Sequence, residues 1–262
     1  MTSLPSLTSF SEGWDSEARL VEGRWVERRP RRPEVARQLH TEVRLLPWLA
    51  PQLPLPVPAP TVTCTEPLLV RHELVPGEAL TTPDVAQARR LGGFLCALHA
   101  ADPAEAVRRG TPPAERVREQ RTAMVAEFDS RVLPLLPAER RESAAALLAE
   151  VAALPAHTLV HGDLGPEHIL TRDGELTGVI DFGDVHIGDP AIDLAWALNG
   201  TPPAFADALA TAYAASPQLR QRALVWHQLG PWHEVTHGLD LDDAEIVRGG
   251  VDGILDRLDD GT

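Results

Sequence analysis

The spacing of hydrophobic residues changes near residue 75. Before it, short apolar runs separated by Gly and Pro turns predict strands, including a hairpin that turns at Glu22-Gly23-Arg24. One helix is predicted to open at Pro33, because apolar side chains recur at spacings of four, four and three residues on one face (Val35, Leu39, Val43 and Leu46). The alternating prolines of 51–60 predict an extended connector.

Beyond residue 76 the spacing predicts helices. Thr82 is expected to cap the first of them, with Pro83 in its first turn. The other predicted helices are two within 114–153, broken near Leu133-Pro134, and those at 190–199, 203–214, 217–238 and 242–259. We therefore expect an α+β fold with two lobes, a small antiparallel β-sheet lobe at 1–75 and a larger helical lobe at 76–262.

One β-rich stretch, residues 159–194, interrupts the helical half. Two apolar runs in it end in acids on turns, His161-Gly162-Asp163 and Asp181-Phe182-Gly183-Asp184. Asp173-Gly174 between them predicts a tight hairpin, because this pair accepts positive φ. The hairpin would bring Asp163 and His168 close to Asp181. Two carboxylates and an imidazole would then converge as a candidate Mg²⁺ and phosphate site.

The amino-acid composition limits the classes of binding partner to be expected. The 262 residues are 44% hydrophobic and 24% charged, which is ordinary for a soluble domain. A net charge of −14 disfavours nucleic acid and anionic membranes as partners. The acidity suits a cationic substrate, although solubility alone is the simpler explanation. The chain has no Lys, so the basic side chain expected at the nucleotide phosphates must be an Arg.

The two cysteines, Cys64 and Cys96, match neither a disulfide framework nor a metal-ligand spacing. We expect both to be reduced and packed in the core. The first residues lack the pattern of a signal peptide, and no apolar run is long enough for a transmembrane helix. A cytoplasmic protein is therefore expected, and the sequence leaves open whether it is a monomer or a dimer.

The acidic turns belong to a longer series of motifs. These are HGDL at 161–164, HIL at 168–170, IDFGD at 180–184 and IGDPAIDL at 187–194, with WVERRPR at 25–31 and LCALH at 95–99 in support. In this order and spacing, the chain resembles the aminoglycoside and macrolide phosphotransferases, a branch of the protein-kinase-like superfamily. The resemblance extends over roughly residues 8–240.

The resemblance implies a role for each matched residue. Asp163 would be the catalytic aspartate that faces the acceptor hydroxyl, and Asp181 the main Mg²⁺ ligand. His168 stands where many members have Asn, the second metal ligand, so direct ligation by His168 is left open. Arg28 takes the place of the strand lysine, with Glu42 as its ion-pair partner. A flap over the phosphates is expected at 11–16.

The same resemblance implies where the two substrates bind. The backbone of Glu73, Leu74 and Val75 would hold the base of ATP or GTP. Side chains near the C-terminal helices would bind an antibiotic-like acceptor. For that role the sequence offers Asp163 and Asp184 of the acidic turns and Trp232, His233 and Glu234 further on. His161, Asp189 and Asp193 are expected to be structural.

Several functions remain open at this point. The leading one is a kinase that inactivates an antibiotic or similar natural product with ATP or GTP. A metabolic kinase for a sugar, amino alcohol or homoserine-like acceptor is the nearest alternative. A protein kinase is disfavoured, because HGD replaces HRD and the glycine-rich loop keeps a single Gly.

Two alternatives come from other classes. A metallohydrolase would use a His and Asp ligand set, namely His161, Asp163, His168, Asp181 and His186. That set lacks two His at metal spacing on one helix. A catalytically inactive nucleotide-binding protein is disfavoured, because the acid pair is intact.

Overall fold

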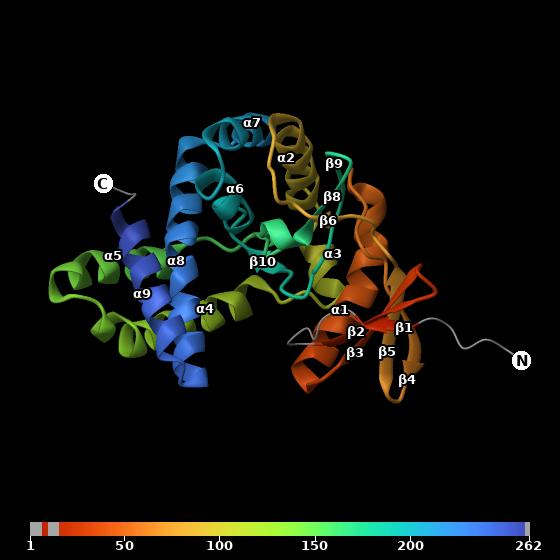
Figure 1. Cartoon of the computed structure of the whole chain (residues 1–262), viewed down its shortest axis with the longest axis horizontal. Helices are drawn as coiled ribbons and strands as arrows, with labels where there is room; N and C mark the ends of the chain where they lie inside the picture. The colour runs from red at the N-terminus through yellow and green to blue at the C-terminus, as the bar shows by residue number, and fades with distance from the viewer. Residues whose placement is uncertain (1–6, 10–15, 260–262) are drawn as a thin grey trace, which may run out of the picture.

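The computed structural model describes residues 7–9 and 16–259, and its fold is α+β as predicted (Figure 1). An antiparallel sheet near the N-terminus has the strand order β1-β2-β3-β5-β4. Its strands are β1 (Leu7–Ser9), β2 (Ser16–Val21), β3 (Trp25–Pro30), β4 (Thr61–Thr65) and β5 (Leu68–Glu73). Helix α1 (Pro33–Leu49) packs on this sheet through Val35 and Leu39, which contact Val70.

The predicted hairpin between β2 and β3 is confirmed. Val21 pairs with Trp25, and Glu22 and Gly23 between them have φ values of 56° and 64°. A non-glycine residue in this left-handed region is uncommon, so the turn relies on Gly23 as its second member. Strand β3 ends at Pro30, and Pro33 opens α1 as expected.

Helix α1 also belongs to the core of the helical half. Its last two turns bury Leu45, Leu46 and Leu49 in the cluster that holds Leu91 and Leu95 of helix α2. The extended connector after α1 is held by a hydrogen bond from the Val179 N–H to the Pro56 carbonyl, 3.0 Å long. One continuous core therefore crosses the lobe boundary expected near residue 75, and α1 is shared by both sides.

The helical half contains α2 (Val85–His99), α3 (Pro103–Arg108), α4 (Ala114–Arg131), α5 (Arg141–Ala153), α6 (Ala195–Asn199), α7 (Pro203–Tyr213), α8 (Pro217–Leu241) and α9 (Ala244–Asp259). The expected break between α4 and α5 is confirmed. Thr82 as the cap of α2 was wrong. Asp84 is the cap, because its side chain accepts from the Gln87 N–H while the Gln87 amide accepts from the Asp84 N–H.

Helices α4, α5, α8 and α9 enclose a second core, which includes Phe128, Leu229 and Trp232. Elsewhere, a Cβ on Gly92 of α2 would lie 2.8 Å from the Ala212 Cβ of α7, so this glycine permits close helix packing. Both cysteines are free, as expected, but the prediction that they pack in the core was wrong. Cys64 and Cys96 are both exposed, since β4 is an edge strand and Cys96 points off the buried face of α2.

Two small sheets carry the acidic turns. One pairs β7 (Thr158–Val160) with β10 (His186–Gly188), and the other orders β6 (Glu78–Ala79), β8 (Ile169–Arg172) and β9 (Glu175–Val179) as β6-β8-β9. The hairpin at Asp173-Gly174 is confirmed, with φ values of 53° and 82°. These pairings bring the loops after β7 and β9 together.

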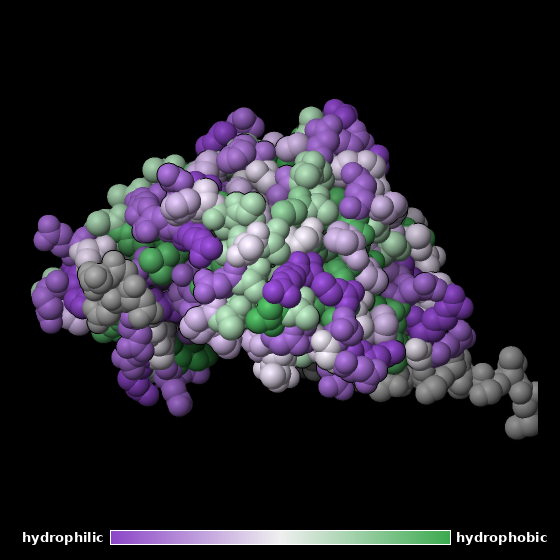
Figure 2. Space-filling view, turned by 90° about the horizontal axis from the view of Figure 1, so that it is seen from above, coloured by the Kyte–Doolittle hydropathy of each residue, from purple (hydrophilic) through white to green (hydrophobic). Residues whose placement is uncertain are grey.

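On the face shown in Figure 2, hydrophobic residues are interspersed among hydrophilic ones. Within the described part of the chain, no helix combines the length and the apolar character needed to cross a membrane.

Candidate active site

The loop after β7 presents Asp163 on a turn that needs a glycine. Gly162 has φ +89°, and a Cβ there would overlap the carbonyl oxygen of Asp184. This close approach joins the loop that carries Asp163 to the segment that follows Asp181. The two acidic turns of the sequence therefore pack directly against each other.

A buried carboxylate holds this loop from below. Asp193 is fully buried and accepts hydrogen bonds from the His161 N–H (2.7 Å), the Gly162 N–H (2.9 Å) and His99 Nε2 (3.0 Å). Burial alone would raise the pKa of Asp193, but these donors and the neighbouring histidines hold that pKa below its usual value. The expected structural role of Asp193 is thus confirmed.

His161 and Asp189 are structural as well. The Nε2–H of His161 donates to the Ile180 carbonyl (2.9 Å), and Nδ1 accepts the Asp163 N–H (3.3 Å). Asp189 is buried and accepts from the Arg222 guanidinium (2.9 Å). Because both ring nitrogens of His161 are occupied, it cannot ligate a metal. The structure thus argues against the metallohydrolase set, and the described residues contain no group of three or more His, Cys, Asp or Glu able to hold a metal by themselves.

Asp163, His168 and Asp181 converge as the hairpin predicted. His168 Nε2 lies 3.7 Å from Asp181 Oδ2, and His168 Nδ1 lies 3.8 Å from Asp163 Oδ2. His168 Nδ1 is also 2.7 Å from the Asp163 carbonyl oxygen. That contact requires a proton on Nδ1, which leaves the Nε2 lone pair of a neutral ring facing Asp181. The side chain of Asp163 is 59% exposed and that of Asp181 48%, so both are accessible to ligands.

Asp181 occupies a strained backbone position. Its φ is 64°, which non-glycine residues adopt rarely outside turns and functional sites. A long hydrogen bond from the Gly183 N–H to its Oδ1 (3.4 Å) orients the carboxylate. In this conformation the Asp181 carboxylate lies beside His168.

Arg28 of β3 and Glu42 of α1 form the ion pair that the resemblance implied. Arg28 Nη1 lies 2.8 Å and 3.1 Å from the two carboxylate oxygens, and Arg28 Nε donates to Ser16 Oγ at 3.3 Å. Burial raises the pKa of Glu42, Arg28 opposes that rise, and the nearby charge of Asp181 adds to it. The ion pair therefore lies within electrostatic reach of the candidate metal site.

The three residues expected to bind the nucleotide base differ in whether their backbone N–H groups are free to donate. The Leu74 N–H is already bonded to the Arg24 carbonyl (2.7 Å), and the Glu73 side chain pairs with Arg24 (2.5 Å). The Val75 N–H has no hydrogen-bond partner among the described residues. Of the expected flap at 11–16, only Ser16 falls within the described residues.

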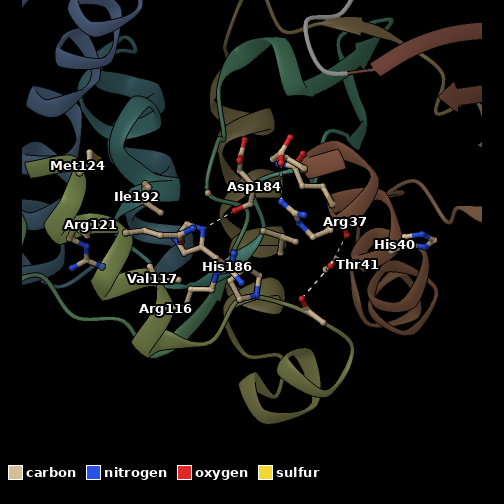
Figure 3. A pocket seen from close by; sticks show the side chains of 18 of the residues that line it. Arg37, His40, Thr41, Arg116, Val117, Arg121, Met124, Asp184, His186 and Ile192 are labelled. Atoms are coloured by element: carbon tan, nitrogen blue, oxygen red, sulfur yellow. Dashed lines mark hydrogen bonds and ion pairs between the residues drawn. The ribbon is translucent and has the colours of Figure 1, made fainter. Parts of the chain in front are cut away.

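A cavity of about 950 Å³ lies beside the acidic turns, between α1 and α4. Figure 3 shows Arg116, Val117, Arg121 and Met124 of α4 on one side and Arg37 and Thr41 of α1 on the other, with Asp184 and His186 between them. Asp184 and His233 line this cavity, in keeping with two of the predicted acceptor contacts. Desolvation lowers the pKa of His233, while the charge of Asp163 opposes that shift.

The other two C-terminal candidates do not reach the cavity. Trp232 as a stacking residue was wrong, because it is fully buried in the second core, where its ring lies 5.7 Å from that of Phe128. Glu234 is exposed, but it is not part of the cavity wall. Successive helical residues point about 100° apart, so only His233 of this trio faces the cavity.

Sequence reasoning missed most of the cavity wall. Arg37, Gln38, Thr41 and Arg44 face it from α1, and Arg116, Gln120 and Met124 face it from α4. The spacing of three and four residues along α1 marks a polar face, but nothing local shows that α4 lies opposite. Of these residues, only Arg116 is unusual in the sequence. It is a cation in the first turn of a helix, where it opposes the helix dipole, and such a position can indicate a role other than helix stability.

Comparisons with known proteins give the fold and the family. The chain aligns over 98% of its length with the GDP and kanamycin complex of the phosphotransferase APH(2″)-IIIa, with a TM-score of 0.85, 25% identity and 94% of that chain covered. It also aligns over 95% of its length with the macrolide 2′-phosphotransferase MphH from Brachybacterium faecium, with a TM-score of 0.76, 27% identity and 91% of that chain covered. The small antiparallel sheet and the larger helical part therefore form a bilobal, protein-kinase-like fold.

Sequence comparison agrees. A viomycin phosphotransferase from Streptomyces vinaceus is 42% identical over 128 residues, which is 45% of this chain and 43% of that relative. The chain thus matches less than half the length of this curated relative. The model of the phosphotransferase enzyme family matches residues 6–231. The resemblance inferred from the motifs is therefore confirmed, and the chain belongs to the phosphotransferase enzyme family.

Proposed function

We propose that this protein transfers the γ-phosphoryl group of GTP or ATP to a hydroxyl of an antibiotic or similar natural product. The observation that carries the proposal is the convergence of Asp163, His168 and Asp181 beside the Arg28–Glu42 ion pair. Phosphoryl transfer depends on positioning and on charge neutralisation, and this set offers a group for each task.

Asp163 is the residue we assign to the acceptor hydroxyl. Its carboxylate is more than half exposed, and its loop is held rigidly by Asp193 below. A carboxylate held in this way orients the attacking oxygen and accepts its proton late in the transfer. The anchored loop keeps the acid in place without covering it.

His168 and Asp181 would suit as the protein ligands of a Mg²⁺ ion whose other ligands come from the substrate and water. The Nε2 lone pair and the Asp181 carboxylate face the same space, 3.7 Å apart. Mg²⁺ commonly takes one or two protein ligands and fills its shell with phosphate oxygens and water. When bound there, Mg²⁺ would neutralise charge on the β- and γ-phosphates. The Nδ1 bond to the Asp163 carbonyl sets the tautomer that makes direct ligation by His168 possible.

The nucleotide would lie between β3 and the loop after β9. Arg28 keeps guanidinium donors beyond its bond to Glu42, and these suit the α- and β-phosphates. The Val75 N–H is the donor we assign to the base, since that of Leu74 is already used. GDP in the APH(2″)-IIIa structure supports GTP as a donor for this protein too, with ATP as the alternative.

The acceptor class follows from the relatives. Those reported above are named for viomycin and for a macrolide, or were solved with kanamycin. These names support an antibiotic or a similar natural product as acceptor, and inactivation of that compound as the outcome. We place the reaction in the cytoplasm, where nucleoside triphosphates are supplied.

A crossed screen tests the proposal. Purified protein is incubated with Mg²⁺ and either GTP or ATP, together with viomycin, kanamycin, a macrolide, homoserine or a simple sugar. Mass spectrometry then looks for the addition of one phosphoryl group. We expect a product with at least one antibiotic, formed about 10²–10⁴-fold more slowly by the Asp163→Asn variant. Product from homoserine or sugar alone would favour the metabolic kinase, and no product at all would reject the proposed function.

A further inference from the structure

The cavity between α1 and α4 has a charge opposite to that of the whole chain. Its wall includes Arg37, Arg44, Arg116 and Arg121, against two carboxylates, those of Glu34 and Asp184. Gln38 and Gln120 add further amide donors. The protein as a whole carries −14. Net charge is therefore a poor guide to what this cavity binds, because binding depends on the groups that face the ligand.

Most of these charges already have partners. Glu34 pairs with Arg37 through a single Nη2 contact at 3.1 Å, so this exposed pair offsets one of the two acids and leaves the other donors of Arg37 unused. Arg121 is buried, donates to the carbonyls of Leu154 and Pro155, and has its guanidinium 5.4 Å from the centre of the Trp226 ring. Its role is to support the wall.

The Nε–H of Arg44 donates to the Arg109 carbonyl (3.0 Å), and the other N–H groups of its guanidinium remain available. The other acid, Asp184, lies between α1 and α4 in Figure 3, and its carbonyl oxygen closely approaches Gly162, next to Asp163. Three histidines also line the cavity, namely His40 of α1, His186 next to Asp184, and His233 of α8, on which the charge of Asp163 acts. The parts of the wall that α1 and α4 contribute are therefore rich in hydrogen-bond donors.

Arg116 differs from the other arginines. Its side chain is exposed toward the cavity and has neither an ion pair nor a hydrogen bond among the described residues. It lies in the first turn of α4, whose N-cap, Pro113, provides no side-chain cap. A cation at that end of a helix opposes the macrodipole. Arg116 therefore offers all of its guanidinium donors to whatever occupies the cavity.

We propose that the acceptor presents carboxylate or carbonyl oxygens to Arg37 and Arg116, on facing walls of the cavity, with Arg116 as a determinant of specificity. A guanidinium group binds a carboxylate through two parallel hydrogen bonds and can also donate to a carbonyl oxygen. An acceptor that placed ammonium groups there would meet like charge. Any cationic part of the acceptor belongs near Asp184 instead. The inference rests on the proposed function, because it assigns the cavity to the acceptor of that reaction.

Binding can be tested without turnover. The melting temperature is measured with citrate and with spermine at constant ionic strength, for the wild type and for Arg116→Ala, with Arg118→Ala as the matched control. Arg118 is exposed on the same helix but lies outside the cavity wall. We expect citrate to stabilise the wild type and Arg118→Ala more than Arg116→Ala, and spermine not to distinguish the three. Citrate also stabilises proteins by exclusion from their surface, so equal citrate shifts in the three proteins would overturn the inference.

Kinetics gives a second readout on any acceptor that the screen identifies. Loss of a charged hydrogen-bond partner should raise KM about 10-fold or more in Arg116→Ala, with kcat nearly unchanged and the Arg118→Ala values close to wild type. A lower or unchanged KM would overturn the inference even when the phosphotransfer itself is present. If no acceptor is phosphorylated, the proposed function fails, whereas the citrate experiment still reports whether the cavity binds carboxylates through Arg116.

Discussion

The catalytic turns and the acceptor cavity touch each other, yet they are built in different ways. The turns carry Asp163, His168 and Asp181 on one short stretch, and buried hydrogen bonds to Asp193 support them. The cavity wall draws on α1, α4, the segment at 183–186 and α8, which lie far apart in the sequence. One site follows from local turn chemistry, and the other depends on how helices pack.

The difference has a functional meaning. Catalytic groups tolerate little movement, and their loop is accordingly tied to the core through Asp193, His161 and His99. The cavity presents exposed surface side chains such as Arg37 and Arg116. Their substitution should change the free energy of unfolding little. Changes in the turns should therefore alter kcat, and changes in the wall should alter KM.

The largest effect is expected for Asp163→Asn. Loss of the positioned carboxylate should lower kcat by about 10²–10⁴-fold. The fold should remain, because the side chain of Asp163 is 59% exposed. Steady-state kinetics and a melting curve measure the two effects separately. A loss of kcat below tenfold would contradict the assignment of Asp163.

A change in the core next to the cavity should have a different signature. Trp232→Ala should lower the free energy of unfolding by about 3–5 kcal/mol, because it empties a fully buried site against Phe128. Glu234→Ala is the neighbouring control and should stay within about 0.5 kcal/mol. Denaturant unfolding measures both variants. A selective rise in acceptor KM for Trp232→Ala, at unchanged stability, would restore Trp232 as a binding residue.

Asp193→Asn tests whether the catalytic loop depends on its buried anchor. The folded pKa of Asp193 lies below its usual value, so its carboxylate stabilises the fold above the unfolded pKa, and that stability is lost as pH falls through the folded pKa. The variant should be about 1–3 kcal/mol less stable at neutral pH. It should also show a weaker fall in stability on acidification, and a lower kcat. Unfolding curves between acid and neutral pH check this, and parallel profiles for the two proteins would argue against it.

The smallest effect concerns Glu42. Burial raises its folded pKa although Arg28 opposes the rise, so its contribution to stability is full below the unfolded pKa and declines as pH rises through the folded value. The stability difference between wild type and Glu42→Gln should therefore shrink with rising pH. Unfolding curves in the absence of nucleotide measure it. A difference that grows with pH would show that the ion pair with Arg28 outweighs burial.

The chemistry of the turns was readable from local sequence. Asp-Gly predicted the hairpin that brings Asp163 and Asp181 together, and the glycine of HGD takes the positive φ that the turn requires. The Arg28–Glu42 pair followed from the family resemblance and not from spacing. Periodicity located the helices that have a marked apolar face, such as α1 and α9. The start of α2 was missed, since Asp84 with Gln87 made a better cap than Thr82.

Which residues line the acceptor cavity depends on how the helices pack. Periodicity places Trp232, His233 and Glu234 on one helix, but only the rotation of α8 against α4 and α9 buries the first and turns the second toward the cavity. The exposure of Cys64 and Cys96 depends in the same way on which faces find partners. Hydrogen-bonded turns form within a few residues and are encoded there. A wall shared by α1 and α4 exists only once the core between them has formed.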